Sequence, residues 1–351
     1  MPKSIPSTPA EVTSGWLSQI LGAEVDSVHT APIGTGQTGA TYRVWVTYRD
    51  GSELPASFAV KLPSQNETVR DRVTIGYRSE HAFYTKVADH VQIPVPHCHH
   101  CEIAGDGADF VLLLDDMAPA EQGDQIAGCT PAEATLAVLA LADLHGPSWA
   151  DPRWANFPGI AMPKPEPDSA KGFGDVAQMA ADITLDKIGA RLDAEDRDTM
   201  RAAMSVVTPW LLAEPDRFAI LHGDYRLDNM LFDPDRTRIT VVDWQTLGAG
   251  LPARDLSYFT ATSLDPAVRA GAEADLVTAY HDRLRSHGVA GYDRETCWQD
   301  YRLGMLQAPL ITVLGTAFAS STERGDDMMV TMAQRGCQAI RDLGTLDLIN
   351  A

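Results

Sequence analysis

The chain has 351 residues, of which 44% are hydrophobic, and its 28 Lys and Arg against 48 Asp and Glu give a formal net charge of −20. This length and composition argue against global disorder and are typical of a globular protein with two domains or lobes. The negative charge argues against nucleic acid or an anionic membrane as a partner, because a field of this sign repels polyanions.

Cellular location is suggested by what the sequence lacks. No apolar run reaches the length that spans a membrane, and the first residues, Met1 to Pro6, lack the apolar core of a signal peptide. The 5 cysteines are odd in number and lack the spacing of a disulfide framework, which is typical of a reducing compartment. We therefore expect a cytoplasmic protein.

One helix and three strands are predicted at the start of the chain. A capping box at Thr8–Glu11 opens the helix, which is expected to run to about Leu21. Alternating apolar residues predict strands over residues 25–33, 41–48 and 57–61.

Three glycines, Gly34, Gly36 and Gly39, lie between the first two strands. In a dinucleotide-binding unit such glycines open a helix, but here β-branched and aromatic residues follow and end at a hairpin turn. The glycines therefore join two strands. They form either a loop whose bare backbone lies against phosphates or a flexible hairpin loop.

A cluster of His and Cys side chains, His97-Cys98-His99-His100-Cys101, follows a segment with helical spacing over residues 76–89. Strand alternation would place His97, His99 and Cys101 on one face and the other two on the opposite face. A structural zinc site normally needs four convergent ligands, and no second Cys/His cluster accompanies this one. We interpret the cluster as strand residues with polar tips, with a zinc site as the alternative.

The second half of the chain is mainly helical by its patterns. A buried strand at Phe110–Leu114 comes first, and a second capping box, Thr130–Glu133, then opens a helix that runs to about His145. A proline-containing loop is expected between Trp149 and Gly174. Further helices are expected near residues 175–190 and 194–213 and from 265 to the end.

The most informative stretch, Leu221–Phe232, combines side chains suited to phosphoryl transfer. Asp224 follows a strand-like apolar run, Asn229 comes five residues later, and a second strand-like segment ends at Asp243. Phosphoryl transfer needs a carboxylate that orients and deprotonates the attacking hydroxyl, and hard oxygen ligands for magnesium. Asp224 suits the first role, and Asn229 and Asp243 suit the second.

This pattern, His-x-Asp-x-x-x-x-Asn followed by a metal-binding Asp, resembles the catalytic loop of kinase-like phosphotransferases. The triplets His222-Gly223-Asp224 and Asp243-Trp244-Gln245 differ from those of protein kinases. They resemble the aminoglycoside phosphotransferase and choline kinase superfamily, closest to its ecdysteroid-kinase-like (CHK kinase-like) branch. The resemblance implies an α+β, bilobal, protein-kinase-like fold. Its N-lobe, an antiparallel sheet plus a helix, would span residues 1–117, and its larger, mainly helical C-lobe residues 118–351.

The resemblance also implies roles for residues of the first lobe. The glycines of residues 34–39 would cover the phosphates of the nucleotide, and Lys61 would bind its α- and β-phosphates. Glu80 would hold Lys61 in place, although an exposed helix glutamate is an alternative for this residue. Backbone groups near Leu114, Asp116 and Met117 would receive the adenine.

Two residues of the second lobe are expected to support the catalytic loop. His145, at the end of a helix, would pack under the loop, with a catalytic base as the alternative. Asp255 would cap the N-terminus of a helix and brace the backbone of the loop.

We therefore predict an enzyme that uses ATP and Mg2+ to transfer the γ-phosphoryl group to a hydroxyl of a small molecule. One alternative is a non-catalytic, pseudokinase-like binding module. A protein kinase is a second alternative, but Gly223 replaces an Arg, and residues 243–255 leave no room for a long activation segment. The acceptor stays open between an aminoglycoside, an amino alcohol, an apolar alcohol and an acyl-CoA, with the branch resemblance favouring an apolar hydroxylated compound.

Overall fold

The computed structural model describes residues 5–33, 39–49, 52–66, 69–70, 73–105, 107–319 and 321–350. Within these residues, the N-terminal part forms a five-stranded sheet in the order β1-β2-β3-β5-β4, in which all neighbours are antiparallel. The strands are β1 (Val25–Pro32), β2 (Gly39–Tyr48), β3 (Ser57–Pro63), β4 (Cys98–Ala104) and β5 (Asp109–Asp115).

The two faces of this sheet enter different hydrophobic cores, because successive side chains of a strand point to opposite faces. Val111 and Leu113 of β5 pack into a small core with α1 (Ser14–Leu21). Leu112 and Leu114 belong to the large core, which continues into the helical part of the chain. The sheet therefore meets the helical C-terminal part through one face, while α1 packs on the other face.

A helical segment between β3 and β4 contributes to the large core. It consists of α3 (Thr74–Ala82), the π-helical turn η2 (Phe83–Val87) and the 3-10 turn η3 (Ala88–His90). Tyr77 and Phe83 are fully buried there, and Tyr77 stacks on Phe110 of β5. This packing fixes α3 against the sheet.

The rest of the chain is mainly helical. Its helices are α4 (Pro131–Ser148), α5 (Pro167–Ile188), α6 (Ala194–Ser205), α7 (Val207–Leu212), α8 (Ala253–Ser263), α9 (Pro266–Ser286), α10 (Arg294–Gly304), α11 (Gln307–Phe318), α12 (Glu323–Leu343) and α13 (Thr345–Asn350). Its short strands are β6 (Glu121–Gln122), β7 (Ala219–Leu221), β8 (Met230–Phe232), β9 (Ile239–Val241) and β10 (Gly248–Gly250). Further 3-10 turns are η1 (Pro9–Glu11), η4 (Pro152–Trp154), η5 (Gly189–Arg191) and η6 (Leu227–Asn229).

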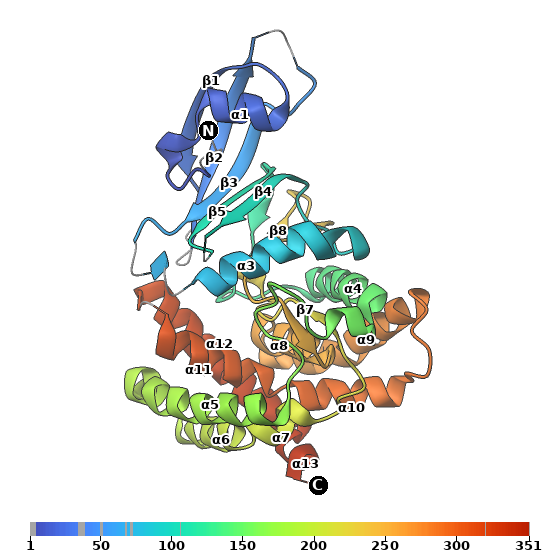
Figure 1. The fold of residues 1–351 in the computed structure, drawn as a ribbon. Helices are drawn as coiled ribbons and strands as arrows, with labels where there is room; N and C mark the ends of the chain where they lie inside the picture. Colours follow the sequence, from blue (N-terminus) through green and yellow to red (C-terminus); the bar gives the residue numbers. More distant parts are fainter. Residues whose placement is uncertain are drawn as a thin grey trace.

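The sheet lies at one end of the molecule and most helices at the other, with the short strands between α3 and the C-terminal helices (Figure 1). This arrangement confirms the predicted α+β fold, with an antiparallel sheet and a mostly helical C-terminal part. The boundary at residues 117 and 118 stays a prediction. Across the described ranges, no helix is both long and apolar enough to cross a membrane.

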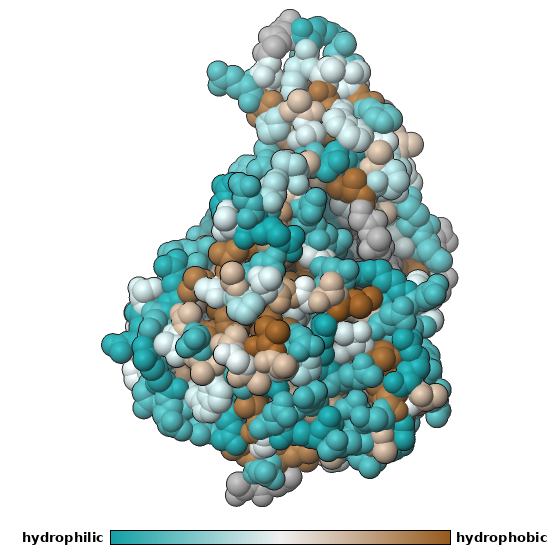
Figure 2. Space-filling view, turned by 180° about the vertical axis from the view of Figure 1, so that it is seen from behind, coloured by the Kyte–Doolittle hydropathy of each residue, from teal (hydrophilic) through white to brown (hydrophobic). Residues whose placement is uncertain are grey.

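The surface agrees with the many acidic residues of the chain. The face opposite to that of Figure 1 is mostly hydrophilic and carries separate hydrophobic patches, most of them on the helical part (Figure 2). The free cysteines described are Cys98, Cys101, Cys129, Cys297 and Cys337, and none forms a disulfide.

Two predicted helix starts are wrong. The Thr8–Glu11 box opens only the short turn η1, and α1 begins after Thr13, which accepts a hydrogen bond from the backbone N–H of Trp16 at 3.2 Å. Val12 lies between the two elements, and its side chain is buried in the small core. Helix α5 begins at Pro167 instead of near residue 175, since proline fits the first helical position.

The predicted alternation of the His and Cys cluster is also wrong, because β4 contains an irregularity between Cys98 and His100. Cys98 pairs with Leu114 and Cys101 pairs with Leu112, so both cysteines lie on the same face of the sheet. His99 is the extra residue. No group of three or more His, Cys, Asp or Glu side chains suited to a metal ion occurs in the part of the chain that the structure describes.

Candidate active site

Lys61 lies between two carboxylates that are far apart in the sequence. Its Nζ is 2.7 Å from Oε2 of Glu80 in α3 and 3.0 Å from Oδ1 of Asp243, which follows β9. Strand β3 points Lys61 towards the large core, where only 13% of its side chain is exposed, and Glu80 is almost fully buried. Lys61 therefore joins the sheet to α3 and to the segment after β9.

The charges at this contact determine the pKa values of its members. Burial alone would lower the pKa of Lys61, but the carboxylates of Asp243 and Glu80 outweigh this effect and raise it, so Lys61 is a cation. Burial raises the pKa of Glu80, and Lys61 opposes that rise. Burial acts in the same direction on Asp243, but the charge of Lys61 prevails and lowers its pKa.

The backbone of Asp243 is in the left-handed region, with φ of 67°, which is rare for a residue with a side chain. The next residue fixes this conformation. The ring of Trp244 is fully buried and stacks on Phe83 of η2, with 3.5 Å between ring centroids and 3° between planes. The stack joins the Asp243 segment to the helical segment that carries Glu80.

Asp224 has a different environment, because hydrogen-bond donors surround its carboxylate. Arg226 Nε lies 3.0 Å from both carboxylate oxygens. The hydroxyl of Tyr258 in α8 donates to Oδ1 at 2.8 Å, and Asn229 Nδ2 donates to Oδ2 at 3.1 Å. These three donors together contact both carboxylate oxygens and thereby orient the carboxylate.

Asn229 and Asp243 are neighbours because β8 and β9 are antiparallel. The backbone carbonyl of Asn229 accepts a hydrogen bond from the N–H of Val242 at 3.0 Å, next to Asp243. The amide nitrogen of Asn229 also donates to the carbonyl of Asp224 at 2.8 Å, which leaves Oδ1 on the other side of the amide group. One amide oxygen and one carboxylate are the hard oxygen donors that magnesium prefers, so this pair fits a magnesium ion.

Gly223, between His222 and Asp224, has no room for a side chain. Its φ is 83°, and a Cβ atom would lie 2.4 Å from the carbonyl oxygen of Thr246. The imidazole of His222 bridges the two segments of the site: Nδ1 accepts from the N–H of Asp224 at 3.3 Å, and Nε2 donates to the carbonyl of Val242 at 3.1 Å. These contacts place a ring proton of His222 on Nε2 and leave Nδ1 as an acceptor.

Asp255 braces the backbone of the catalytic loop, but it is not a helix N-cap as predicted. Helix α8 begins at Ala253, so Asp255 lies in its first turn, where it is completely buried. Its carboxylate accepts hydrogen bonds from the N–H groups of His222 and Gly223 at 2.6 and 3.1 Å. These bonds replace the capping role, because they require the side chain to point away from its own helix end.

His145 of α4 lies beneath Asp255, fully buried, with Nε2 3.6 Å from its carboxylate. Nδ1 of His145 is 2.7 Å from the hydroxyl of Tyr280 in α9. Burial lowers the pKa of His145, and Asp255 only partly opposes this. The geometry therefore fits a neutral structural histidine and gives no access to a substrate.

The other predicted nucleotide-binding residues lie near the end of β5. Leu114 is buried in that strand. Asp116 forms an ion pair with Arg43 at 2.8 Å, and the carbonyl of Met117 accepts a hydrogen bond from the N–H of Ala120 at 2.8 Å. That these residues receive the adenine stays a prediction.

The glycine-rich segment is described only at its end. Gly34 and Gly36 lie outside the described residues, and Gly39 is the first residue of β2, paired with Pro63 of β3. Thr41 of β2 pairs with Lys61 in the same ladder. The glycine-rich segment therefore ends close to Lys61, at the same end of strands β2 and β3. Its role as a lid stays a prediction.

Sequence analysis missed Arg226, Tyr258 and Gln245 as members of the site. Gln245 Nε2 lies 3.5 Å from Glu80 Oε2, and Arg226 also contacts Asp228 at 3.1 Å. Arg226 lies between Asp224 and Asn229, and Gln245 ends the triplet that begins at Asp243. Their positions beside expected site residues could have indicated that they belong to the site. Tyr258 gives no local signal, since only the fold brings α8 to the loop.

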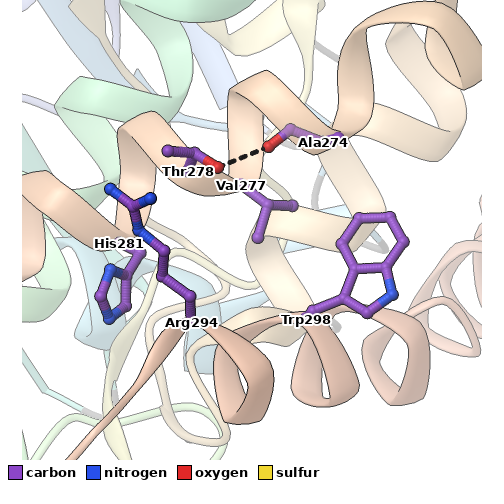
Figure 3. Close-up of a pocket in the computed structure, with 6 residues that line it drawn as sticks. All are labelled: Ala274, Val277, Thr278, His281, Arg294 and Trp298. Atoms are coloured by element: carbon purple, nitrogen blue, oxygen red, sulfur yellow. Dashed lines mark hydrogen bonds between the residues drawn. The ribbon is translucent and has the colours of Figure 1, made fainter.

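A separate surface pocket, with a volume of about 180 Å³, lies between α9 and α10. Figure 3 shows Val277 and Trp298 on one side of it and His281 and Arg294 on the other. Arg294 is already paired with Asp282 at 2.9 Å. None of the predicted site residues lines this pocket, so it is not part of the candidate active site.

A model of the phosphotransferase enzyme family matches residues 29–295. The match covers most of the chain and includes Lys61, Asp224 and Asp243. The protein therefore belongs to this family.

Individual proteins match the chain either over a short segment or at low sequence identity. Acyl-CoA dehydrogenase family member 11 of Gallus gallus is 38% identical over 63 residues, which are 16% of this chain and 8% of the relative, so the match spans a small part of that protein. Choline kinase LicA from Streptococcus pneumoniae has 15% identity and a TM-score of 0.52, with 94% of this chain and 97% of that chain covered. An ethanolamine kinase of Plasmodium vivax has 13% identity and a TM-score of 0.53, with 89% and 83% covered. At these identities the two structures show a shared fold.

Proposed function

We propose that the protein transfers the γ-phosphoryl group of ATP to a hydroxyl group of a small molecule, with Mg2+ as the metal. The observation that carries this proposal is the juxtaposition of Asp224, Asn229 and Asp243 with the Lys61–Glu80 ion pair. Family membership supports it independently. Only 11 residues separate Asp243 from Asp255, which supports a small acceptor over a protein substrate.

Asp224 is the group we assign to the acceptor. The hydroxyl oxygen of the acceptor bonds to the γ-phosphorus, and the bond from that phosphorus to the oxygen bridging to the β-phosphate breaks. ADP leaves, and Asp224 takes the proton of the hydroxyl. The backbone bonds from His222 and Gly223 to Asp255 hold the loop that positions this carboxylate.

The hydroxyl of the acceptor would compete with the donors that already contact Asp224. The contact with Arg226 is the one we expect to give way. Its Nε is shared between both carboxylate oxygens, and Arg226 keeps Asp228 as a partner at 3.1 Å. The bonds from Tyr258 and Asn229 are directed at single oxygens and would keep the orientation of the carboxylate.

Lys61, Asn229 and Asp243 are the groups we assign to the nucleotide. Lys61 would contact the α- and β-phosphates, and Glu80 would keep it in place when Asp243 turns to the metal. Asn229 and Asp243 would hold magnesium, which supplies positive charge against the phosphates. The amide nitrogen of Asn229 donates to the carbonyl of Asp224, so its Oδ1 is the atom that would contact the metal.

Transfer can be tested with a panel of hydroxylated compounds, which includes an aminoglycoside, an amino alcohol, an apolar alcohol and a hydroxyacyl-CoA. ADP release that depends on the acceptor, together with a phosphorylated product seen by mass spectrometry, is the expected result. Asp224→Asn should lower turnover by about 100- to 10,000-fold and leave ATP affinity unchanged, because the lost step is a proton transfer. The control is Asp182→Asn, an exposed residue of α5. Wild-type turnover in Asp224→Asn would contradict the assignment.

A further inference from the structure

Part of the sheet face that carries Lys61 is not covered by the large core. Thr41 of β2 pairs with Lys61, so Arg43 and Trp45 of the same strand lie on this face as well. Ala59 of β3 packs against the large core, but no apolar residue of β1 or β2 within the described ranges does. Trp45 is 40% exposed, and the side chain of Arg43 is 30% exposed. This part of the face is therefore open to a ligand.

Two contacts hold the guanidinium group of Arg43. Its Nε is 2.8 Å from Oδ2 of Asp116, which follows β5, and only 6% of the side chain of Asp116 is exposed. The guanidinium carbon also lies over the ring of Trp45, 5.9 Å from the ring centroid. Trp45 is itself stacked on His29 of β1, with 5.3 Å between ring centroids. The guanidinium is therefore fixed between β2 and the end of β5.

A guanidinium held in this way keeps a flat surface for a further contact. Its N–H groups lie in its plane, so the ion pair with Asp116 uses an edge of the group and not a face. Both faces of a guanidinium can stack on aromatic rings. Trp45 contacts one face at most, which leaves the other for a second aromatic ring.

The position of Arg43 fits the base of the proposed nucleotide. Arg43 pairs with Ala59, two residues from the pair of Thr41 with Lys61, which corresponds to about 7 Å along the strand. Lys61 is assigned to the phosphates, and the ribose of a nucleotide separates its phosphates from its base. Asp116 belongs to the segment that is predicted to receive the adenine. A base in that position would meet the guanidinium of Arg43.

We propose that Arg43 is a nucleotide-binding residue whose guanidinium stacks on the purine base, and that Asp116 is the residue that positions it. The role of Arg43 rests on the proposed function, because it requires a nucleotide beside Lys61. Every base has a π face, so stacking adds affinity for ATP and GTP without choosing between them. Arg43 therefore contributes to the affinity for the base and not for the phosphates.

The test is calorimetry of the full-length protein in the presence of Mg2+, with ATP, GTP and inorganic tripolyphosphate as separate ligands. Tripolyphosphate has the same number of phosphates as ATP but no base, so it measures what Lys61 and the metal contribute. Arg43→Lys is the main variant, since it keeps a cation for Asp116 but removes the planar group. The matched control is Arg49→Lys, because Arg49 follows β2 and forms an exposed ion pair with Glu24 at 2.9 Å.

The wild type should bind ATP and GTP more tightly than tripolyphosphate. Arg43→Lys should weaken the binding of both nucleotides by about 5- to 50-fold and leave the affinity for tripolyphosphate unchanged. Asp116→Asn should weaken nucleotide binding by a smaller factor, because Arg43 keeps its contact with Trp45. Arg49→Lys should change none of the three affinities. Urea denaturation of each variant shows that it is folded.

Two results would overturn the role of Arg43 alone. One is equal ATP affinity in Arg43→Lys and the wild type. The other is an equal loss of affinity for ATP and for tripolyphosphate, which would place Arg43 at the phosphates. If the wild type binds no ATP, the proposed function and the role of Arg43 fail together. The measurements therefore distinguish the failure of the one from the failure of the other.

Discussion

Asp224 and Asp243 are the two carboxylates that the proposed reaction depends on, and the structure holds them in different ways. Donors from Arg226, Asn229 and Tyr258 surround Asp224, and all of them lie in the catalytic loop or in α8. Asp243 has one charged partner, Lys61, which comes from the sheet. The side chain of Asp224 is 23% exposed and that of Asp243 is 38% exposed.

Asp224 is thus held by several donors, whereas Asp243 depends on one partner, which must change in the proposed function. Asp224 is oriented within one buried framework, which suits a group that must meet a hydroxyl in a defined direction. Asp243 is balanced by Lys61. In the proposed function, a metal ion would replace Lys61 beside Asp243, and phosphates would replace Asp243 beside Lys61. Three substitutions test the framework of Asp224, and one tests the exchange at Asp243.

Gly223→Ala should have the largest effect on the Asp224 framework. An alanine at φ of 83° is strained, and its Cβ would lie 2.4 Å from the backbone oxygen of Thr246. The strain and the forced shift together should lower the free energy of unfolding by about 2–5 kcal/mol, measured by urea denaturation. The matched control is Gly172→Ala at an open position of α5, which should raise stability by up to about 1 kcal/mol. Equal effects of the two substitutions would contradict the account.

The buried pair of His145 and Asp255 should make this framework sensitive to acid. Because burial lowers the pKa of His145 below its ordinary value of 6.5, the unfolded chain binds a proton that the folded chain does not. Stability should therefore be complete above about pH 6.5 and fall as the pH decreases from there towards the lowered pKa. The slope from this residue is at most about 1.4 kcal/mol per pH unit. Urea denaturation of His145→Gln between pH 5 and 8 should lack this component, and an unchanged slope would contradict it.

Tyr258→Phe should have the smallest effect, because it removes one of the four hydrogen bonds to Asp224. The loss of orientation should lower kcat by about 3- to 10-fold, which corresponds to about 1 kcal/mol, while KM stays unchanged. Steady-state kinetics with an accepted hydroxyl compound gives both constants. If KM falls instead, the hydroxyl of Tyr258 competes with the acceptor and does not orient Asp224.

The fold class could be predicted because the sequence resembles a known family, and the motifs that carry this resemblance are local. Strand alternation, the glycines before β2 and the spacing of Asp224, Asn229 and Asp243 all lie within short segments. The contact of Lys61 with Glu80 was also within reach, since a resemblance to a known family implied it. The functional roles of these residues remain predictions.

Other features depend on packing, which no short segment reveals. One extra residue at His99 reverses the face of Cys98, and neither composition nor alternation indicates it. Tyr258 reaches Asp224 from 34 residues away only because α8 packs against the catalytic loop. Asp255 was predicted as a helix cap because its position near a helix start can be read from neighbouring residues. Its hydrogen bonds to His222 and Gly223 cannot, because these residues are distant in the sequence.

In the proposed function, Asp243 exchanges Lys61 for a magnesium ion when nucleotide binds. The most direct test is calorimetry of ATP binding with and without Mg2+, on the wild type and on Asp243→Asn, with Asp182→Asn as the control. We expect Mg2+ to strengthen ATP binding by about 10-fold or more in the wild type and the control, a gain of about 1.4 kcal/mol, and we expect Asp243→Asn to lose this gain. An equal gain in Asp243→Asn, or no ATP binding by the wild type, would contradict the account.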